Sequence, residues 1–193
     1  MHAHANVRAI AFDAFGTLIS YGGARFNPYR RLFHAGRAHS ERLPFLTRNV
    51  PAATFATELG LEHTMADFER ELSEELAGLR LFDDAPDVLR RARDAGLRLA
   101  VCSNLATEYG TAVRRLLPDL DAHILSYEVG AAKPDAAIYA ATCLALDCAP
   151  DGVIFVGDSR RCDFHGPHAF GMRARWLDRT GGQTLLDALK GVL

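Results

Sequence analysis

The sequence has no long apolar run, no strong net charge and few residues that could form a disulfide framework. It contains no stretch of about 18 uninterrupted apolar residues, which is the length that a membrane-spanning helix needs. Its formal net charge is only -2 at pH 7. A chain so nearly balanced shows no overall attraction to nucleic acid or to a membrane surface. We therefore expect neither as a partner, and the sequence does not indicate an oligomeric state.

Cysteine is scarce and irregularly spaced. Cys102, Cys143, Cys148 and Cys162 include no Cys-x-x-Cys pair, which argues against a thiolate metal cluster and against a disulfide framework. Residues 1–6 lack the apolar run of a secretory signal. We therefore expect reduced thiols and a cytoplasmic protein.

The apolar content that is present, 49% of the 193 residues, is enough for one domain or for a domain with a small insert. The apolar runs that predict strands are Val7–Phe12, Leu97–Ser103, His123–Ser126, Val153–Gly157 and Ala174–Leu177. The patterns that predict helices are Pro86–Ala95, Tyr109–Leu117, Pro134–Leu146, Asp163–Phe170 and Leu185–Leu193. Continuous apolar strands that alternate with helices favour an α/β fold with a doubly wound parallel sheet. A mixed α+β domain is the alternative.

Residues 20–81 interrupt this alternation and look purely helical. Thr64 and Asp67 have the spacing of a capping box, and apolar residues follow at three- and four-residue intervals. The segment is too long for an ordinary strand–helix loop. We therefore divide the chain into an α/β core, residues 1–19 and 82–193, and a helical insert, residues 20–81.

Charges in this insert are segregated along the chain. The basic residues come first and are Arg25, Arg30, Arg31, Arg37, Arg42 and Arg48; the acidic residues, from Glu58 to Glu75, follow. One interpretation is a basic surface that attracts an anionic substrate. The other, which we favour, is that the two groups pair with each other or face solvent.

Polar side chains stand where several predicted strands end. Asp13 follows the first strand and precedes a turn that contains Gly16 and Thr17, and Ser103 and Asn104 end the second strand. A carboxylate at the carboxyl end of a parallel strand is well placed to act as a nucleophile. Taken alone, each of these segments is also compatible with an ordinary turn.

Two further segments carry charge. Lys133 stands just before Pro134, near a helix start, where the helix dipole gives a cation no reason to be. Asp158 and Asp163 follow the strand Val153–Gly157, and a pair of carboxylates suits a hard divalent cation. An N-cap role for Asp163 would account for one of these carboxylates but not for both.

In this order, the four segments resemble the motifs of the haloacid dehalogenase-like superfamily, from Val7 to about Leu177. The resemblance implies that the helical insert is a cap over an active site that takes a small anionic substrate. It implies catalytic roles for Asp13, Ser103 and Lys133, substrate contacts from Gly16, Thr17 and Asn104, and a Mg²⁺ ion held by Asp13, the main-chain carbonyl of Phe15, Asp158 and Asp163.

The sequence departs from the phosphatases of that superfamily at Phe15. These enzymes usually have a second aspartate there, which acts as the proton donor, and a positioned acid contributes on the order of 10²–10⁴ in rate. A leaving group that departs unprotonated, as from an acyl phosphate, would not need the acid. Otherwise the insert could supply a donor, for which Tyr29, His34 and His39 are candidates.

The resemblance leaves three functions open. We expect a Mg²⁺-dependent phosphatase or phosphotransferase that acts through an aspartyl-phosphate on a small phosphorylated metabolite. The first alternative is a 2-haloacid dehalogenase, which uses its aspartate without metal. Such enzymes have an aromatic residue at the position of Phe15, as this chain does. Their fourth motif reads Ser-x-Asn, however, where this chain has Gly157 and Asp158. The second is a non-catalytic phosphate-binding module, against which the intact Asp13, Lys133 and Asp158 argue.

Overall fold

The main sheet is built around the strand that carries Asp13. The computed structural model describes residues 7–23, 25–32 and 42–193. Within them, five parallel strands lie in the order β5-β4-β1-β6-β7: β1 (Ala9–Phe12), β4 (Arg98–Ser103), β5 (Ala122–Leu125), β6 (Val153–Gly157) and β7 (Arg173–Trp176). The central strand β1 pairs with β4 on one side and with β6 on the other. The predicted doubly wound α/β fold is confirmed.

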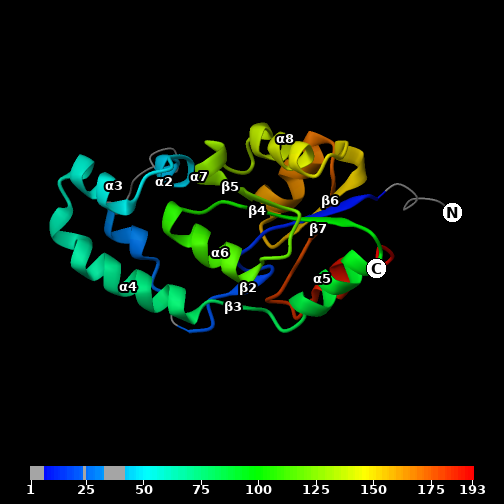
Figure 1. Ribbon diagram of the computed structural model, residues 1–193, viewed down its shortest axis with the longest axis horizontal. Helices are drawn as coiled ribbons and strands as arrows, with labels where there is room; N and C mark the ends of the chain where they lie inside the picture. The colour runs from blue at the N-terminus through cyan, green and yellow to red at the C-terminus, as the bar shows by residue number, and fades with distance from the viewer. Residues whose placement is uncertain (1–6, 24, 33–41) are drawn as a thin grey trace.

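Helices cover both faces of this sheet (Figure 1). Ile10 and Phe12 pack on one face with α5 (Ala85–Asp94), α6 (Gly110–Leu116) and α10 (Leu185–Ala188). Ala9 and Ala11 pack on the other face with α8 (Ala136–Ala145) and α9 (Gly166–Phe170). Because successive side chains point to opposite faces, a strand covered on both sides must be apolar throughout. This is why the strands were visible in the sequence as continuous apolar runs.

Two predicted boundaries next to the site are wrong. The predicted strand His123–Ser126 ends at Leu125, and Ser126 begins the short helix α7 (Ser126–Val129). Pro134 was predicted in the first turn of its helix, but α8 begins at Ala136, with Asp135 as the N-cap that accepts a 2.9 Å hydrogen bond from the Ala137 N–H. An aspartate cap satisfies a free N–H group of the first turn. Lys133 and Pro134 therefore lie in the loop that precedes the helix.

The helix predicted over Asp163–Phe170 is two elements. A π-helical segment, η5 (Arg160–His165), precedes α9, and the Ser159 side chain caps it by accepting from the Cys162 N–H. Asp163 lies inside η5, so the N-cap interpretation of Asp163 is wrong. The C-terminal helix predicted to reach Leu193 ends at Ala188 and begins with a capping box of Thr184 and Asp187 that the pattern did not reveal.

The insert lies at one end of the molecule, away from α5 and the C-terminus (Figure 1). Its described elements are η1 (Pro28–Leu32), α2 (Pro44–Thr47), α3 (Ala52–Leu59), η2 (Glu62–Thr64) and α4 (Met65–Gly78). It is not purely helical, because two short antiparallel strands, β2 (Ile19–Ser20) and β3 (Arg80–Leu81), join it to the core. The predicted capping box is also absent, since the Thr64 hydroxyl donates to the Leu61 carbonyl instead.

Three of the basic residues of the insert, Arg30, Arg31 and Arg48, pair with its acidic residues, as in the interpretation favoured above. Arg31 and Arg30 bind Glu71 at 2.6 and 3.0 Å, and Arg48 binds Glu58 at 2.7 Å. Arg37, His34 and His39 lie outside the described residues. Among the helices that the structure describes, none is long and apolar enough to cross a membrane.

Candidate active site

Three adjacent strands deliver the predicted site residues to one edge of the sheet. Asp13 follows β1, Ser103 ends β4 and Asp158 follows β6. The Asp13 N–H donates to the Val156 carbonyl at 2.9 Å and so extends the pairing of β1 with β6. Because parallel strands end together, side chains that are 90 and 145 positions apart from Asp13 meet at one place.

One oxygen of the Asp13 carboxylate is held by two donors. Oδ1 accepts from Ser103 Oγ at 3.0 Å and from Lys133 Nζ at 2.8 Å. All three residues are buried. Among the described residues, no donor contacts the other oxygen, Oδ2. The carboxylate is therefore oriented by its neighbours and keeps one oxygen available for reaction.

Lys133 bridges two carboxylates. Besides Asp13, its ammonium contacts Asp163 Oδ1 at 2.6 Å. Burial acts to lower the pKa of Lys133, but the charges of Asp13 and Asp163 outweigh it and hold that pKa well above its ordinary value. Lys133 is therefore charged at neutral pH.

Asn104 holds the main chain of Lys133. Its Nδ2 donates to the Lys133 carbonyl at 2.8 Å, and its Oδ1 accepts from the Lys133 N–H at 2.7 Å. Both ends of the amide are used in this way, so the geometry supports a positioning role for Asn104. The substrate contact that the resemblance implied for it stays a prediction.

Three carboxylates converge beside Lys133. One oxygen from each of Asp13, Asp158 and Asp163 lies within 4.8 Å of one oxygen from each of the others. Partial desolvation of its carboxyl group by the surrounding protein, together with the charge of Asp13, raises the pKa of Asp158. Burial also raises the pKa of Asp163, to about 6, against the opposing effect of Lys133. Both pKa shifts come first from desolvation and are increased by the nearby charge of Asp13.

The three carboxylates differ in how many of their oxygens remain free to bind a cation. Asp163 is fully buried, with Oδ1 on Lys133 and Oδ2 on the Ser159 N–H at 2.9 Å. Asp158 is exposed and forms no ion pair within the described residues. Asp13 and Asp158 therefore fit a divalent cation better than Asp163 does, although all three were predicted as ligands.

The backbone around Asp158 supports this fit. A Cβ atom on Gly16 would lie 2.3 Å from Asp158 Oδ2, and Gly16 has a φ of +80°. Only glycine allows the turn after the nucleophile to approach the carboxylate so closely. The Phe15 carbonyl, the predicted main-chain ligand, belongs to this same turn. On the other side, Trp176 Nε1 donates to the Asp158 carbonyl at 2.8 Å and holds its main chain.

Thr17 is placed differently from the other predicted residues. It is fully buried, its hydroxyl has no hydrogen-bond partner in the part of the chain that the structure describes, and its carbonyl accepts from Arg179 at 2.6 Å. Thr17 does not line the cavity that contains Asp13. Its predicted substrate contact has no geometric support here.

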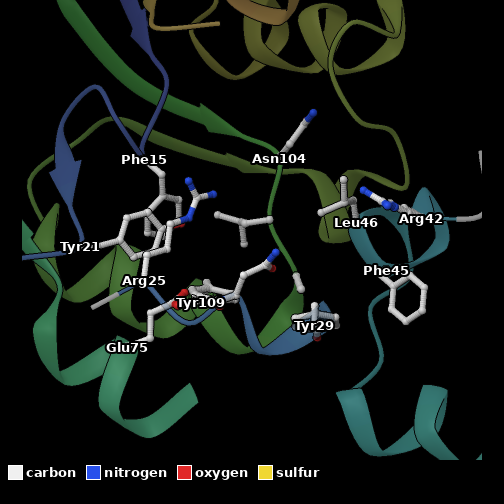
Figure 2. Close-up of a pocket in the computed structure, with 13 residues that line it drawn as sticks. Phe15, Tyr21, Arg25, Tyr29, Arg42, Phe45, Leu46, Glu75, Asn104 and Tyr109 are labelled. Atoms are coloured by element: carbon white, nitrogen blue, oxygen red, sulfur yellow. Dashed lines mark hydrogen bonds between the residues drawn. The ribbon is translucent and has the colours of Figure 1, made fainter. Parts of the chain in front are cut away.

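Two adjoining cavities open beside the nucleophile. One, of about 380 Å³, is lined by the site residues Asp13, Gly16, Ser103, Lys133 and Asp158. The other, of about 330 Å³, lies between the core and the insert (Figure 2). Phe15, Tyr21, Arg25 and Asn104 line both.

Sequence reasoning missed Tyr21 and Arg25 as residues of the site. Arg25 was counted among the basic residues of the insert, and nothing in the local pattern distinguished it from the others. Tyr21 stacks on Phe15 with ring centroids 5.3 Å apart. The candidate donor Tyr29 lies farther off, along the second cavity only, with its hydroxyl bound to Glu108.

The chain is similar to proteins of two activities. A family model described as haloacid dehalogenase-like hydrolase matches residues 7–171. A phosphoserine phosphatase of Thermus thermophilus is 33% identical over 104 residues, which are 51% of this chain and 41% of that protein. An (S)-2-haloacid dehalogenase of Pseudomonas sp. (strain YL) is 29% identical over 196 residues, with 91% of this chain and 84% of that protein covered.

The chain thus spans about two fifths of the length of the phosphatase relative. Among solved structures, a HAD family enzyme of Bacteroides thetaiotaomicron in complex with magnesium and inorganic phosphate has the same fold. The TM-score is 0.67 at 17% identity, with 89% of this chain and 94% of that chain covered.

Proposed function

The chain belongs to the haloacid dehalogenase-like hydrolases, and we propose that within this family it is a Mg²⁺-dependent phosphatase or phosphotransferase with Asp13 as nucleophile. The observation that supports this most is the exposed Asp158 carboxylate beside Asp13. Two neighbouring carboxylates would repel the carboxylate of a haloacid unless a cation lay between them. A phosphorylated substrate that arrives with a divalent cation has no such difficulty.

Asp13 attacks phosphorus with a carboxylate oxygen. The new bond joins Asp13 to phosphorus while the bond to the leaving oxygen breaks and that oxygen keeps the electron pair. Lys133 and Ser103 meanwhile hold Oδ1 at 2.8 and 3.0 Å and compensate part of the charge. Water, or another acceptor, then takes the phosphoryl group from Asp13.

The resident ion would be Mg²⁺, held by Asp13, Asp158 and the Phe15 carbonyl. When bound, it would neutralise charge on the phosphoryl oxygens and on the two carboxylates. The magnesium and phosphate bound to the Bacteroides thetaiotaomicron enzyme are in keeping with this assignment.

Phe15 limits the substrates. Its side chain has no ionisable proton. Of the three predicted donors of the insert, Tyr29 has its hydroxyl bound to Glu108, and His34 and His39 lie outside the described residues. Without an acid at position 15, a leaving group that is stable as an anion departs fastest, as the carboxylate of an acyl phosphate does.

Dehalogenation remains the second candidate, because the (S)-2-haloacid dehalogenase matches 91% of the chain and the phosphatase only 51%.

The proposal is tested by measuring phosphate release from acetyl phosphate with Mg²⁺, with EDTA, and by the Asp13→Asn variant. We expect release with Mg²⁺ only, and a phosphoryl adduct on Asp13 by mass spectrometry. Chloride release from 2-chloropropionate that is insensitive to EDTA would favour dehalogenation. Inertness of the wild type in both assays would favour a binding module.

A further inference from the structure

The cavity of about 330 Å³ beside the site has no role in the chemistry above. It is continuous with the cavity of the nucleophile, since Phe15, Tyr21, Arg25 and Asn104 line both. In Figure 2, Phe15 and Tyr21 stand on one side of this space, and Leu46 and Phe45 of α2 stand on the other. A group attached to a phosphoryl at Asp13 would extend into it.

Two of the three tyrosines that line this cavity, Tyr29 and Tyr109, present ring carbon to it, because their hydroxyls are bound elsewhere. The Tyr109 hydroxyl donates to Glu75 at 2.8 Å, and the Tyr29 hydroxyl donates to Glu108. Glu75 is itself buried and also accepts from the N–H groups of Phe26 and Asn27 at 2.6 and 2.8 Å. Its charge is thus compensated by three donors. With Phe45, Leu46 and Leu105 the wall is mainly apolar.

Phe15 is part of this wall. Its ring stacks on Tyr21 at 5.3 Å and 23°, and it meets Tyr109 edge to face at 5.7 Å and 83°. Both arrangements are ones that aromatic pairs prefer. Phe15 therefore stands where related phosphatases carry the acid, and its ring makes aromatic contacts there instead. The same side chain replaces the acid and completes the apolar wall.

One cation stands at the junction of the two cavities. The Arg25 guanidinium lies 4.7 Å from the centroid of the Tyr21 ring. Arg25 is exposed and lines both cavities. A planar guanidinium that already stacks on one ring has donors left for an oxygen of the leaving group.

We propose that this second cavity binds an aromatic leaving group, so that the substrates are phosphoryl compounds whose leaving group carries a small aromatic ring and departs as a stable oxygen anion. The inference rests on the phosphatase proposal and adds the substrate class. Aromatic acyl phosphates and phosphate esters of acidic phenols share this chemistry. The volume is near the lower end of the roughly 300–1,000 Å³ of small-molecule sites, which suits one small ring system.

The test compares benzoyl phosphate with acetyl phosphate, whose leaving groups have similar acidity and differ in the ring. We expect Mg²⁺-dependent kcat/KM to be about tenfold higher or more for benzoyl phosphate, the discrimination that apolar pocket contacts supply. 4-Nitrophenyl phosphate forms a third arm. A higher kcat/KM for it than for benzoyl phosphate identifies phenol esters as the preferred source, and a lower one identifies acyl phosphates.

Leu46→Trp fills the cavity from α2, at a position that is only partly buried. We expect it to reduce the benzoyl-to-acetyl ratio about tenfold. Leu144→Trp is the control, since Leu144 is 83% exposed on α8 and lines neither cavity. Equal kcat/KM for the two acyl phosphates, or a ratio unchanged in Leu46→Trp, would overturn the aromatic assignment and leave the phosphatase proposal standing. Failure of all three compounds to release phosphate would contradict both the aromatic assignment and the phosphatase proposal.

Discussion

At the scale of single residues, Lys133 balances negative charge in the site. Its ammonium pairs with both Asp13 and Asp163, at 2.8 and 2.6 Å, and it is almost fully buried. A pair of buried carboxylates without this cation would be costly, because removing one partner of a buried ion pair destabilises by about 3–5 kcal/mol. The same side chain therefore supports both folding and the proposed reaction.

We predict that Lys133→Met lowers phosphate release at least about 100-fold, since one positioned donor contributes on the order of 10²–10³ in rate. The free energy of unfolding should fall by about 3 kcal/mol or more. Urea unfolding and acetyl phosphate turnover measure the two effects. The other lysine of the chain, Lys190, is exposed, and Lys190→Met should change neither. Full activity in Lys133→Met would contradict the role of this residue.

Gly16 provides a second prediction at this scale. Alanine there would place Cβ 2.3 Å from Asp158 Oδ2 in a left-handed conformation, which costs roughly 1–2 kcal/mol by itself. We predict that Gly16→Ala weakens cation binding at least about tenfold, because Asp158 must move. The only tryptophan, Trp176, contacts the Asp158 carbonyl, so terbium luminescence sensitised through its indole can report the affinity.

Gly23→Ala is the matched control for this measurement. A Cβ atom on Gly23 would meet nothing within 4 Å, so terbium affinity should stay at the wild-type value. Equal affinity in Gly16→Ala and Gly23→Ala would show that Asp158 does not hold the ion.

At the scale of elements, one turn of 3-10 helix in the core docks the insert. Each residue of η3 (Thr107–Tyr109) bonds to the insert: Thr107 to the Val50 carbonyl, Glu108 to the Tyr29 hydroxyl and the Ala52 N–H, and Tyr109 to Glu75. The insert contributes Tyr29, Phe45, Leu46 and Glu75 to the second cavity. This docking therefore sets the shape of the proposed ring site.

We predict that Glu75→Ala destabilises the protein by about 2–4 kcal/mol, because it removes three hydrogen bonds to a buried carboxylate and leaves their donors unpaired. Thermal and urea unfolding would measure the loss. Glu74→Ala should have almost no effect, since Glu74 neighbours Glu75 on α4 and is exposed. Equal stabilities of the two variants would argue against η3 and Glu75 as the link between insert and core.

The elements also show the limits of local patterns. The strands β1 and β6 could be predicted from apolar runs, and Val153–Gly157 matches to the residue. The capping box at Thr64 could not be judged from spacing, because the hydroxyl has a nearer acceptor in Leu61. Short strands such as Ile19–Ser20 give no periodic signal at all; only their pairing with Arg80–Leu81 defines them.

At the scale of the whole molecule, cation binding and folding are linked. Asp13 and Asp158 come together only when the strands β1 and β6 lie side by side. A ligand that binds only the folded chain stabilises it, by about 2.7 kcal/mol at a concentration 100 times its Kd.

We predict that saturating Mg²⁺ raises the Tm of the wild type by several degrees, that EDTA reverses the shift, and that Asp158→Asn abolishes it. Differential scanning calorimetry would record the shift. Calcium at equal concentration tests for general ionic effects, because Mg²⁺ demands a smaller and more regular site. An equal rise in Asp158→Asn would place the ion elsewhere.

The sequence by itself determined the α/β core and the chemistry available at its strand ends. Apolar runs flanked by Asp13, Ser103 and Asp158 are enough for this, because parallel strands must bring their carboxyl ends to one edge. Only the tertiary structure decided that Asp163 pairs with Lys133, that Asn104 holds the lysine loop, and that Phe15, Tyr21 and Tyr109 form one aromatic wall. These contacts join residues from separate elements. Their formation depends on how the insert packs on the core, which no local spacing encodes.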